Sequence, residues 1–243
     1  MQVSRCCCGP GGCDPVSGYD DGFATFGYTA DPLRGQWRGI LNDPGSQVVR
    51  VFPAGVLEVL EQSVFNGYGW LFDRCANWSP SIVGMSHRLS GQYEAFDVYG
   101  GNYQGVSVFS LFDNNQWQLT HALQYDSAAG GWRLQLILSY DPVGPSGSAF
   151  AESWLSGVLQ TNVLNVPLGP WDFDLEVVHE QLDATQWNLA VANFGNPVLS
   201  VVTAPPNQSG PEWRHGFSSA AAVPGFSAKT TRLDRFSYIA STA

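Results

Sequence analysis

The chain has 243 residues, of which 44% are hydrophobic, 13% aromatic and only 13% charged. This composition suits one large all-β domain or two small domains, and it excludes a disordered chain. The net charge is −10, and the basic residues, ten arginines and the single Lys229, are scattered along the sequence. We therefore expect neither a nucleic-acid partner nor a membrane partner. No apolar run approaches 18 residues, so no transmembrane helix is expected.

The first 22 residues are rich in glycine, proline and cysteine, which predicts an irregular N-terminal arm ahead of a folded domain over residues 23–243. The opening stretch from Met1 to Pro10 contains no apolar segment, so we do not expect a secretory signal. Either the chain stays in the cytoplasm, or it leaves by a route without such a signal, for example as part of a virus particle.

Four of the five cysteines lie within eight residues of the arm, and the fifth is Cys75. Clustered thiolates can bind a soft metal such as zinc, but this spacing matches no common zinc module and no histidine lies nearby. We favour reactive thiols, or one disulfide between the arm and Cys75, over a zinc site. The candidate zinc ligands are Cys6, Cys7, Cys8 and Cys13.

From Phe23 onward, short apolar or alternating runs are separated by turn residues, which predicts strands. The first four predicted strands cover residues 48–52, 56–60, 93–99 and 105–112. Residues 116–125 and 132–140 then alternate between apolar and polar with period two, and a glycine-containing stretch connects them. Two such runs predict a half-buried antiparallel hairpin.

The last third of the chain continues this pattern. Residues 149–158 are predicted to form a helical turn or an insertion. Residues 171–179 and 186–194 alternate and predict a second hairpin, while the apolar run 198–203 predicts a buried strand and 232–239 a closing strand. About a dozen strands without an amphipathic helix must stack two sheets to hide their apolar faces, so we predict an all-β, two-sheet antiparallel jelly-roll sandwich.

The order of these features resembles the concanavalin A-like jelly-roll superfamily of lectins, glucanases and laminin-G-type domains. The resemblance rests on an opening with Phe23, Gln36, Trp37 and Arg38, and on the short Gly-Val-Leu-Glu strand that starts at Gly55. It also rests on the central segment from Gly105 to Leu138 and on the closing stretch TRLDRFSYIA at residues 231–240. It covers residues 23–240 and bears on the fold more than on the function.

The resemblance suggests one catalytic string, because retaining β-glucanases of this superfamily carry Glu-x-Asp-x-Glu on one strand. The matching residues are Asp172, Asp174 and Glu176, which alternation places on one face of a strand. The first position departs from the family, since aspartate is one methylene shorter than glutamate, and the spacing of the carboxylates matters for this chemistry. We expect a polar outer strand face and no enzyme, with a glycoside hydrolase as the alternative.

Other residues suggest binding. Tyr68, Trp70 and Trp78 lie in a glycine- and asparagine-containing stretch, where exposed rings could stack on sugars or could instead fill gaps between sheets. Lectin-like relatives often hold calcium with loop carboxylates and amides, which here would be Asp113, Asn114 and Asn115, although hairpin turns also favour such residues. His121 lies on an apolar face and is expected in the core. We expect no cofactor.

The favoured function is therefore a non-catalytic structural or adhesion module, such as a bacteriophage capsid decoration or tail accessory protein. It would attach through its arm to other structural proteins of the assembly, form a homo-oligomer, and contact surface glycans. The alternative is a carbohydrate-binding lectin domain.

Overall fold

In the computed structural model the described residues form sixteen strands and no helix. The structure describes residues 18–23, 28–29, 37–41, 47–52, 55–63, 70–77, 79–96, 103–112, 115–126, 131–140, 149–154, 168–205, 212–222 and 227–243. Over those residues, nothing helical is long and apolar enough to cross a membrane.

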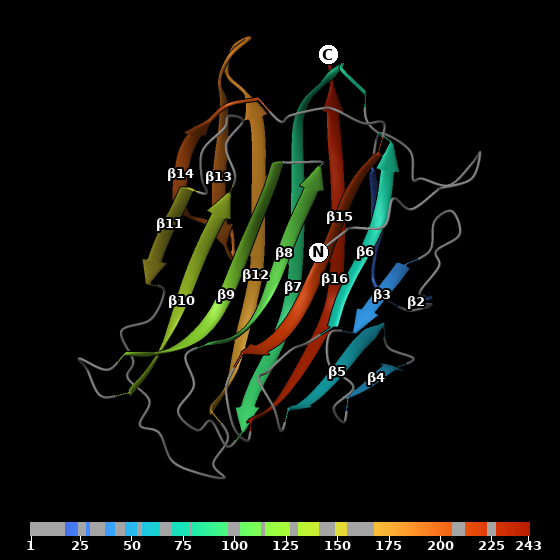
Figure 1. The fold of residues 1–243 in the computed structure, drawn as a ribbon, viewed down its shortest axis with the longest axis vertical. Coiled ribbons are helices and arrows are strands. Elements are labelled where there is room, and N and C mark those ends of the chain that lie inside the picture. Colours follow the sequence, from blue (N-terminus) through green and yellow to red (C-terminus); the bar gives the residue numbers. More distant parts are fainter. Residues whose placement is uncertain are drawn as a thin grey trace.

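The strands form two eight-stranded sheets, and every pairing is antiparallel except the short parallel pair of β2 and β3. Sheet 1 has the spatial order β14 (Asn196–Thr203), β13 (Trp187–Asn193), β12 (Leu168–Gln181), β7 (Ile82–Phe96), β16 (Ser227–Thr242), β5 (Val56–Ser63) and β4 (Gln47–Phe52), and β1 (Gly18–Asp21) also pairs with β16 (Figure 1).

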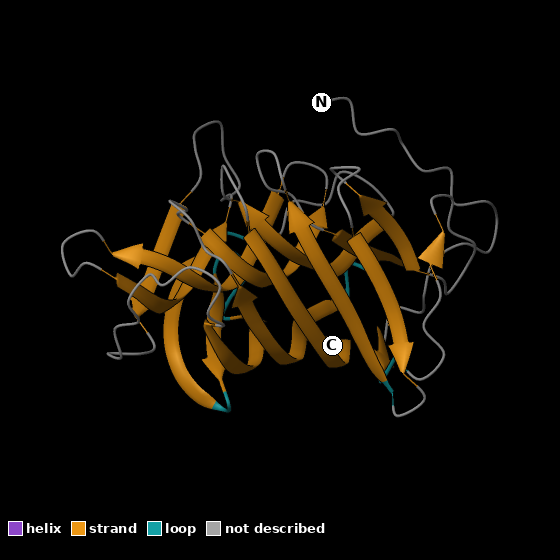
Figure 2. Ribbon diagram, turned by 90° about the horizontal axis from the view of Figure 1, so that it is seen from below, coloured by secondary structure: helices purple, strands orange, loops and turns teal. Residues whose placement is uncertain are grey.

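Sheet 2 stacks on sheet 1, and the strands make two layers in Figure 2. Its spatial order is β11 (Ala149–Trp154), β10 (Gly131–Tyr140), β9 (Asn115–Asp126), β8 (Tyr103–Phe112), β15 (Glu212–Ala222), β6 (Trp70–Asn77), β3 (Trp37–Leu41) and β2 (Tyr28–Thr29). The predicted two-sheet antiparallel sandwich is confirmed.

The core lies between the sheets and is filled by alternate residues of each strand. On β12, Phe173, Leu175 and Val177 are buried, while the residues between them face away from the core. On β9 and β10 the buried apolar set includes Trp117, Leu119, Leu134, Leu136 and Leu138. These are the positions that period-two alternation predicts, because successive side chains of a strand point to opposite faces.

The strand β1 lies inside the segment predicted to be an irregular arm, so that prediction is wrong for Gly18–Asp21. Gly18 has φ +98°, and a Cβ there would lie 1.9 Å from the Tyr238 carbonyl oxygen, so glycine allows β1 to approach β16 closely. Tyr19 then packs on Trp37, Phe236 and Tyr238, with ring centroids 5.8–6.2 Å apart.

Two other predictions are corrected. Residues 149–154 form β11, which pairs with β10, instead of a helical turn or an insertion. The run 198–203 belongs to β14, an edge strand of sheet 1 and not a buried strand, with Val202 58% exposed. A continuous apolar run does not reveal whether a strand has a neighbour on both sides, since that depends on sheet order.

Candidate functional site

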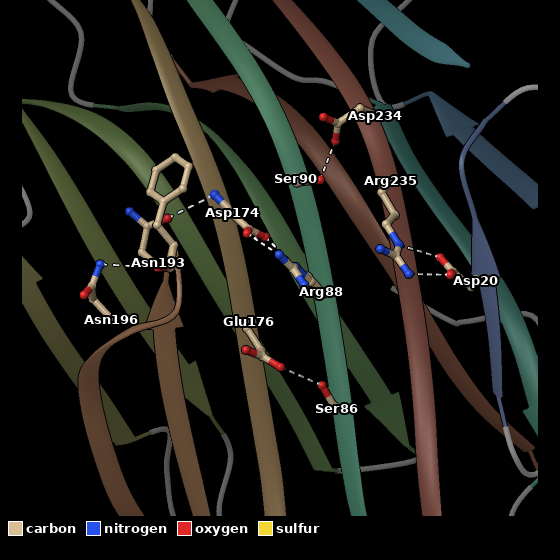
Figure 3. Close-up of polar contacts among 11 residues, drawn as sticks. Asp20, Ser86, Arg88, Ser90, Asp174, Glu176, Asn193, Asn196, Asp234 and Arg235 are labelled. Carbon is tan, nitrogen blue, oxygen red and sulfur yellow. Dashed lines mark hydrogen bonds and ion pairs between the residues drawn. The ribbon is translucent and has the colours of Figure 1, made fainter. Parts of the chain in front are cut away.

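The three carboxylates of β12 lie on the outer face of sheet 1, as their alternation predicts, and each contacts a side chain of β7. Figure 3 shows the contacts of Asp174 and Glu176. The Arg88 guanidinium forms an ion pair with both oxygens of Asp174. Gln92 Nε2 donates to Asp172 Oδ1 over 2.7 Å, and Ser86 Oγ donates to Glu176 Oε1 over 3.3 Å. We call these six residues the polar row: Asp172, Asp174, Glu176, Ser86, Arg88 and Gln92.

The polar row continues across the sheet toward the N-terminal strand. Ser90 on β7 hydrogen-bonds Asp234 on β16, and Arg235 forms a two-pronged contact with Asp20 on β1, at 2.8 and 2.6 Å. The hydrogen bond from Arg235 holds the pKa of Asp20 below its usual value. The same kind of contact with Asp174 raises the pKa of Arg88. This face therefore presents planar, charged and hydrogen-bonding groups that are held in register by the strands.

The turn between β13 and β14 lies beside this row. Its two central residues, Phe194 and Gly195, both have positive φ, at +52° and +71°, which is the signature of a type I′ hairpin turn. The Phe194 N–H donates to the Asp174 carbonyl oxygen over 3.0 Å, and the Asp174 N–H donates to Asn193 Oδ1 over 3.1 Å. We call residues 193–196 the Phe194 turn.

Phe194 is unusual in this position. Type I′ turns favour asparagine, aspartate or glycine at the first central residue, because other side chains pay about 1–2 kcal/mol for the left-handed conformation. The ring is also 54% exposed, so it recovers little of that cost by burial. A strained and exposed aromatic residue beside a row of polar groups indicates a functional position.

This arrangement can bind a small polar ring compound without any chemical step. An exposed aromatic face stacks on the apolar face of a sugar, and carboxylate, amide and guanidinium groups hydrogen-bond its hydroxyls. The alternation of residues 186–194 predicts a strand that ends at Phe194 and does not mark Phe194 as a binding residue. The signal was the Phe-Gly pair between two alternating runs, which marks a two-residue turn.

The aromatic residues predicted to bind sugars are not brought into this site by the described structure. Tyr68 and Trp78 lie outside the described residues. Trp70 opens β6, and its backbone pairs with Ser219 of β15 and Leu41 of β3, in sheet 2.

The predicted metal ligands are only partly described. Cys6, Cys7, Cys8, Cys13, Asp113 and Asn114 lie outside the described residues, and Asn115 begins β9 opposite Phe112. Cys75 on β6 forms a disulfide whose partner lies outside the described part of the chain. Within the described ranges, no three His, Cys, Asp or Glu side chains are grouped to hold a metal ion.

His121 is buried in the core, as predicted, and packs against Tyr93 and Phe173 with ring centroids 5.6 and 5.7 Å apart. Burial lowers the pKa of His121 to about 4. Its role is therefore structural packing as a neutral side chain, away from the outer face.

No protein-family model matches this chain, and no curated protein matches its sequence. The solved structures to which the fold is similar include alginate lyase Aly36B in complex with an alginate tetrasaccharide, with a TM-score of 0.52 at 9% identity over 94% of this chain and 99% of that chain. A second structure of Aly36B gives 0.50 at 11% identity over 92% and 97%. The fold is a concanavalin A-like jelly roll. The predicted resemblance is thereby confirmed for the fold.

Another similar structure with this concanavalin A-like fold is the winged bean acidic lectin with methyl-α-D-galactose, at a TM-score of 0.46 and 12% identity over 93% of this chain and 98% of that chain. At these identities the likeness shows the fold alone. The candidate site consists of the Phe194 turn and the polar row.

Proposed function

We propose that this protein is a carbohydrate-binding module whose ligand stacks on Phe194 and hydrogen-bonds the polar row. The observation that carries the proposal is the exposed ring of Phe194, held at φ +52° next to Asp174. Neither burial nor the preference of the turn explains a phenylalanine at position 194. On an open polar surface, an exposed aromatic ring can bind a sugar by stacking on its apolar face.

The charges of the polar row select the class of sugar. Asp172, Asp174 and Glu176 supply three carboxylates against the one guanidinium of Arg88, and the whole chain carries −10. An anionic polysaccharide would be repelled by this face, because like charges raise the cost of approach. The proposed ligand is therefore a neutral glycan, whose hydroxyls can donate hydrogen bonds to the carboxylates.

The relatives by fold are compatible with this proposal. Aly36B was solved with an alginate tetrasaccharide and the winged bean lectin with a galactoside. A neutral glycan and the anionic alginate differ in charge, so one experiment can separate binding of the two.

The test compares the full chain with two variants, Phe194→Asn and Leu182→Asn. Asparagine suits a type I′ turn, so Phe194→Asn removes the ring without disturbing the hairpin. Leu182 is a matched control because it is 56% exposed on the turn between β12 and β13, at the other end of β13. A glycan array first identifies ligands, and affinity electrophoresis through gels with laminarin, mannan or alginate then compares the three proteins.

We expect retardation by at least one neutral polysaccharide and none by alginate. Phe194→Asn should weaken binding about tenfold, since aromatic stacking is worth about 1.5 kcal/mol, and Leu182→Asn should bind like the unmodified protein. Absence of any neutral ligand, or equal losses in both variants, would contradict the proposal.

Two other predicted functions stay predictions. The first is a role in a virus particle or other assembly, attached through the N-terminal arm, and co-purification with a particle tests it. The second is glycoside hydrolysis by Asp172, Asp174 and Glu176, and it requires a measured turnover that Glu176→Gln abolishes.

A further inference from the structure

The β13–β14 hairpin, residues 187–203, lies at one lateral edge of sheet 1 (Figure 1) and carries the Phe194 turn at its tip. Among the described residues, β13 pairs with β12, and β14 pairs only with β13. No residue of β14 is buried, and a bulge at Val198 interrupts its pairing with β13. The hairpin can therefore separate from β12 without unpairing any other strand, and such weakly packed segments open at lower cost than the centre of a sheet.

His179 holds this hairpin from the core side. It lies on the inner face of β12, only 4% exposed, and its Nε2 atom is 2.9 Å from Thr203 Oγ1 on β14. This hydrogen bond reaches past β13, which lies between β12 and β14 in the sheet. The imidazole also makes a T-shaped contact with the Trp187 ring of β13, with ring centroids 4.9 Å apart. One side chain of β12 thus contacts both strands of the hairpin.

The core around His179 stabilises only the neutral imidazole. The core-facing residues of the elements packed against it are Met85 and His87 on β7, Leu189 and Trp187 on β13, Thr203 on β14, and Trp117, Leu119 and His121 on β9. The only titratable side chains among these are the two histidines, and the carboxylates of β12 lie on the outer face. His179 Nδ1 has no hydrogen-bond partner among the described residues. Burial accordingly lowers the pKa of His179 to about 4.

We infer that protonation of His179 opens the β13–β14 hairpin away from β12, so that acid separates Phe194 from Asp174. In the closed form, an imidazolium at position 179 would leave its Nδ1–H group without an acceptor and would repel a charge on His87. In the open form, water solvates the ring and both of its N–H groups. A proton therefore binds the open form more tightly and shifts the equilibrium toward it.

The consequence for the candidate site rests on the proposed function. Phe194 moves with the hairpin, whereas Asp174 and Arg88 stay with β12 and β7. A sugar that stacks on Phe194 and hydrogen-bonds the polar row contacts both parts at once, so it binds only the closed form. Acid thus weakens binding by moving the aromatic ring, while the side chains of the polar row stay in place.

The pKa values of His179 in the two forms set the size of the effect. The pKa is about 4 in the closed form and takes the ordinary histidine value of 6.5 once the ring is solvated. The equilibrium constant for opening then rises about eightfold between pH 7 and pH 5.5. The preference for the closed form is fully present above about pH 6.5 and is lost as the pH falls toward 4.

The experiment is hydrogen–deuterium exchange of the full chain at pH 7 and pH 5.5 without ligand, followed by mass spectrometry of peptides from the hairpin and from β7. Protection factors are corrected for the intrinsic pH dependence of amide exchange. His179→Gln is the test variant, because an amide can hydrogen-bond Thr203 but does not titrate. His121→Gln is the matched control, since His121 is an equally buried core histidine that packs on Phe173 of β12 and on Tyr93 of β7.

In the unmodified chain, hairpin amides should be less protected than β7 amides at both pH values, and their protection should fall about eightfold at pH 5.5. His179→Gln should remove this fall, and His121→Gln should keep it. The inference is overturned if the hairpin is as protected as β7, or if the fall persists in His179→Gln or disappears in both variants. Should His179→Gln not fold, hairpin protection that stays constant with pH in the unmodified chain overturns it alone. Absence of any neutral glycan ligand at pH 7 contradicts only the proposed function.

Discussion

His87 Nε2 of sheet 1 and His215 Nδ1 of sheet 2 lie 2.6 Å apart, so a hydrogen bond between two histidines crosses the core and links the two sheets. The His215 ring stacks on Tyr238 at 3.7 Å, and the edge of Trp117 packs against His87 at 4.7 Å. One ring must donate and the other accept, so the accepting ring must be neutral and the two rings cannot both be protonated. Because protonation of both rings would break this hydrogen bond, the stability of the fold should depend on pH.

All four histidines of the chain are buried. Burial lowers the pKa of His87 to about 3, with a further contribution from nearby His179, and lowers the pKa of His121 and of His179 to about 4. Burial, together with nearby His87, also lowers the pKa of His215 well below its usual value.

The folded chain thus binds fewer protons than the unfolded chain, in which histidine titrates near 6.5. The resulting stability is present above about pH 6.5 and is lost as pH falls from there toward the folded-state pKa values. From pH 7 to pH 5 the loss is about 2 kcal/mol for each of His87, His121 and His179, or about 6 kcal/mol for the three, and His215 acts in the same direction. Urea denaturation at half-unit pH steps measures it, and equal stability at pH 7 and pH 5 would contradict the prediction.

Asp73, in a buried ion-pair cluster on sheet 2, should lose more stability on substitution by asparagine than the exposed-face Asp174. The Asp73 carboxylate is 1% exposed and accepts from Arg38 Nε at 2.9 Å and from Arg214 Nη1 at 3.0 Å. Asp73→Asn leaves both guanidinium groups without their counter-charge, so we expect a loss of about 3–5 kcal/mol in the free energy of unfolding.

The matched variant is Asp174→Asn on the outer face of sheet 1. Its partner Arg88 has a side chain that is 44% exposed, so solvent screens the pair and the expected loss is below about 1 kcal/mol. Urea denaturation at pH 7 compares the two variants. If both variants lost a similar free energy of unfolding, burial would not determine how much each ion pair stabilises the fold.

Substitution by alanine should have opposite effects on the stability of the fold at two strand glycines, Gly216 and Gly84. At Gly216 a Cβ would lie 2.0 Å from the Phe72 carbonyl oxygen and 2.8 Å from Phe109 Cζ, so Gly216→Ala must displace backbone. We expect it to cost more than about 2 kcal/mol, as overpacking does.

At Gly84 the nearest atoms to an added Cβ lie at 3.8 Å, which is ordinary contact. Gly84→Ala should therefore leave the protein unchanged or stabilise it by about 0.4–1 kcal/mol, because alanine restricts the unfolded chain. Thermal unfolding of both variants tests the pair, and a loss at Gly84 as large as that at Gly216 would contradict it.

The strain at Phe194 predicts that removing the proposed binding ring stabilises the fold. Asparagine adopts the left-handed conformation more readily than phenylalanine, so Phe194→Asn should raise the free energy of unfolding by about 1 kcal/mol. The chemical denaturation midpoint measures the change. If the variant were less stable instead, Phe194 would serve the fold and the argument for a binding role would lose its basis.

Much of this fold is determined by local sequence. The alternation of residues 116–125 and 132–140 identifies β9 and β10, and the alternation of residues 171–179 identifies β12 and the shared face of Asp172, Asp174 and Glu176. Strand period depends only on neighbouring side chains, which is why the sequence alone reveals it. The strands β15 and much of β7 escaped prediction because His87, His215 and Ser219 occupy core positions, so the apolar pattern is interrupted.

Only the tertiary structure decides which strands are neighbours and which are edges. It sets the apolar run 198–203 at the edge of sheet 1 and His87 against His215 between the sheets, and it turns Phe194 from a strand residue into an exposed turn beside Asp174. Each of these contacts joins residues whose distance in space depends on the order of strands in a sheet. That order results from closing two stacked layers around one core, which no local pattern encodes.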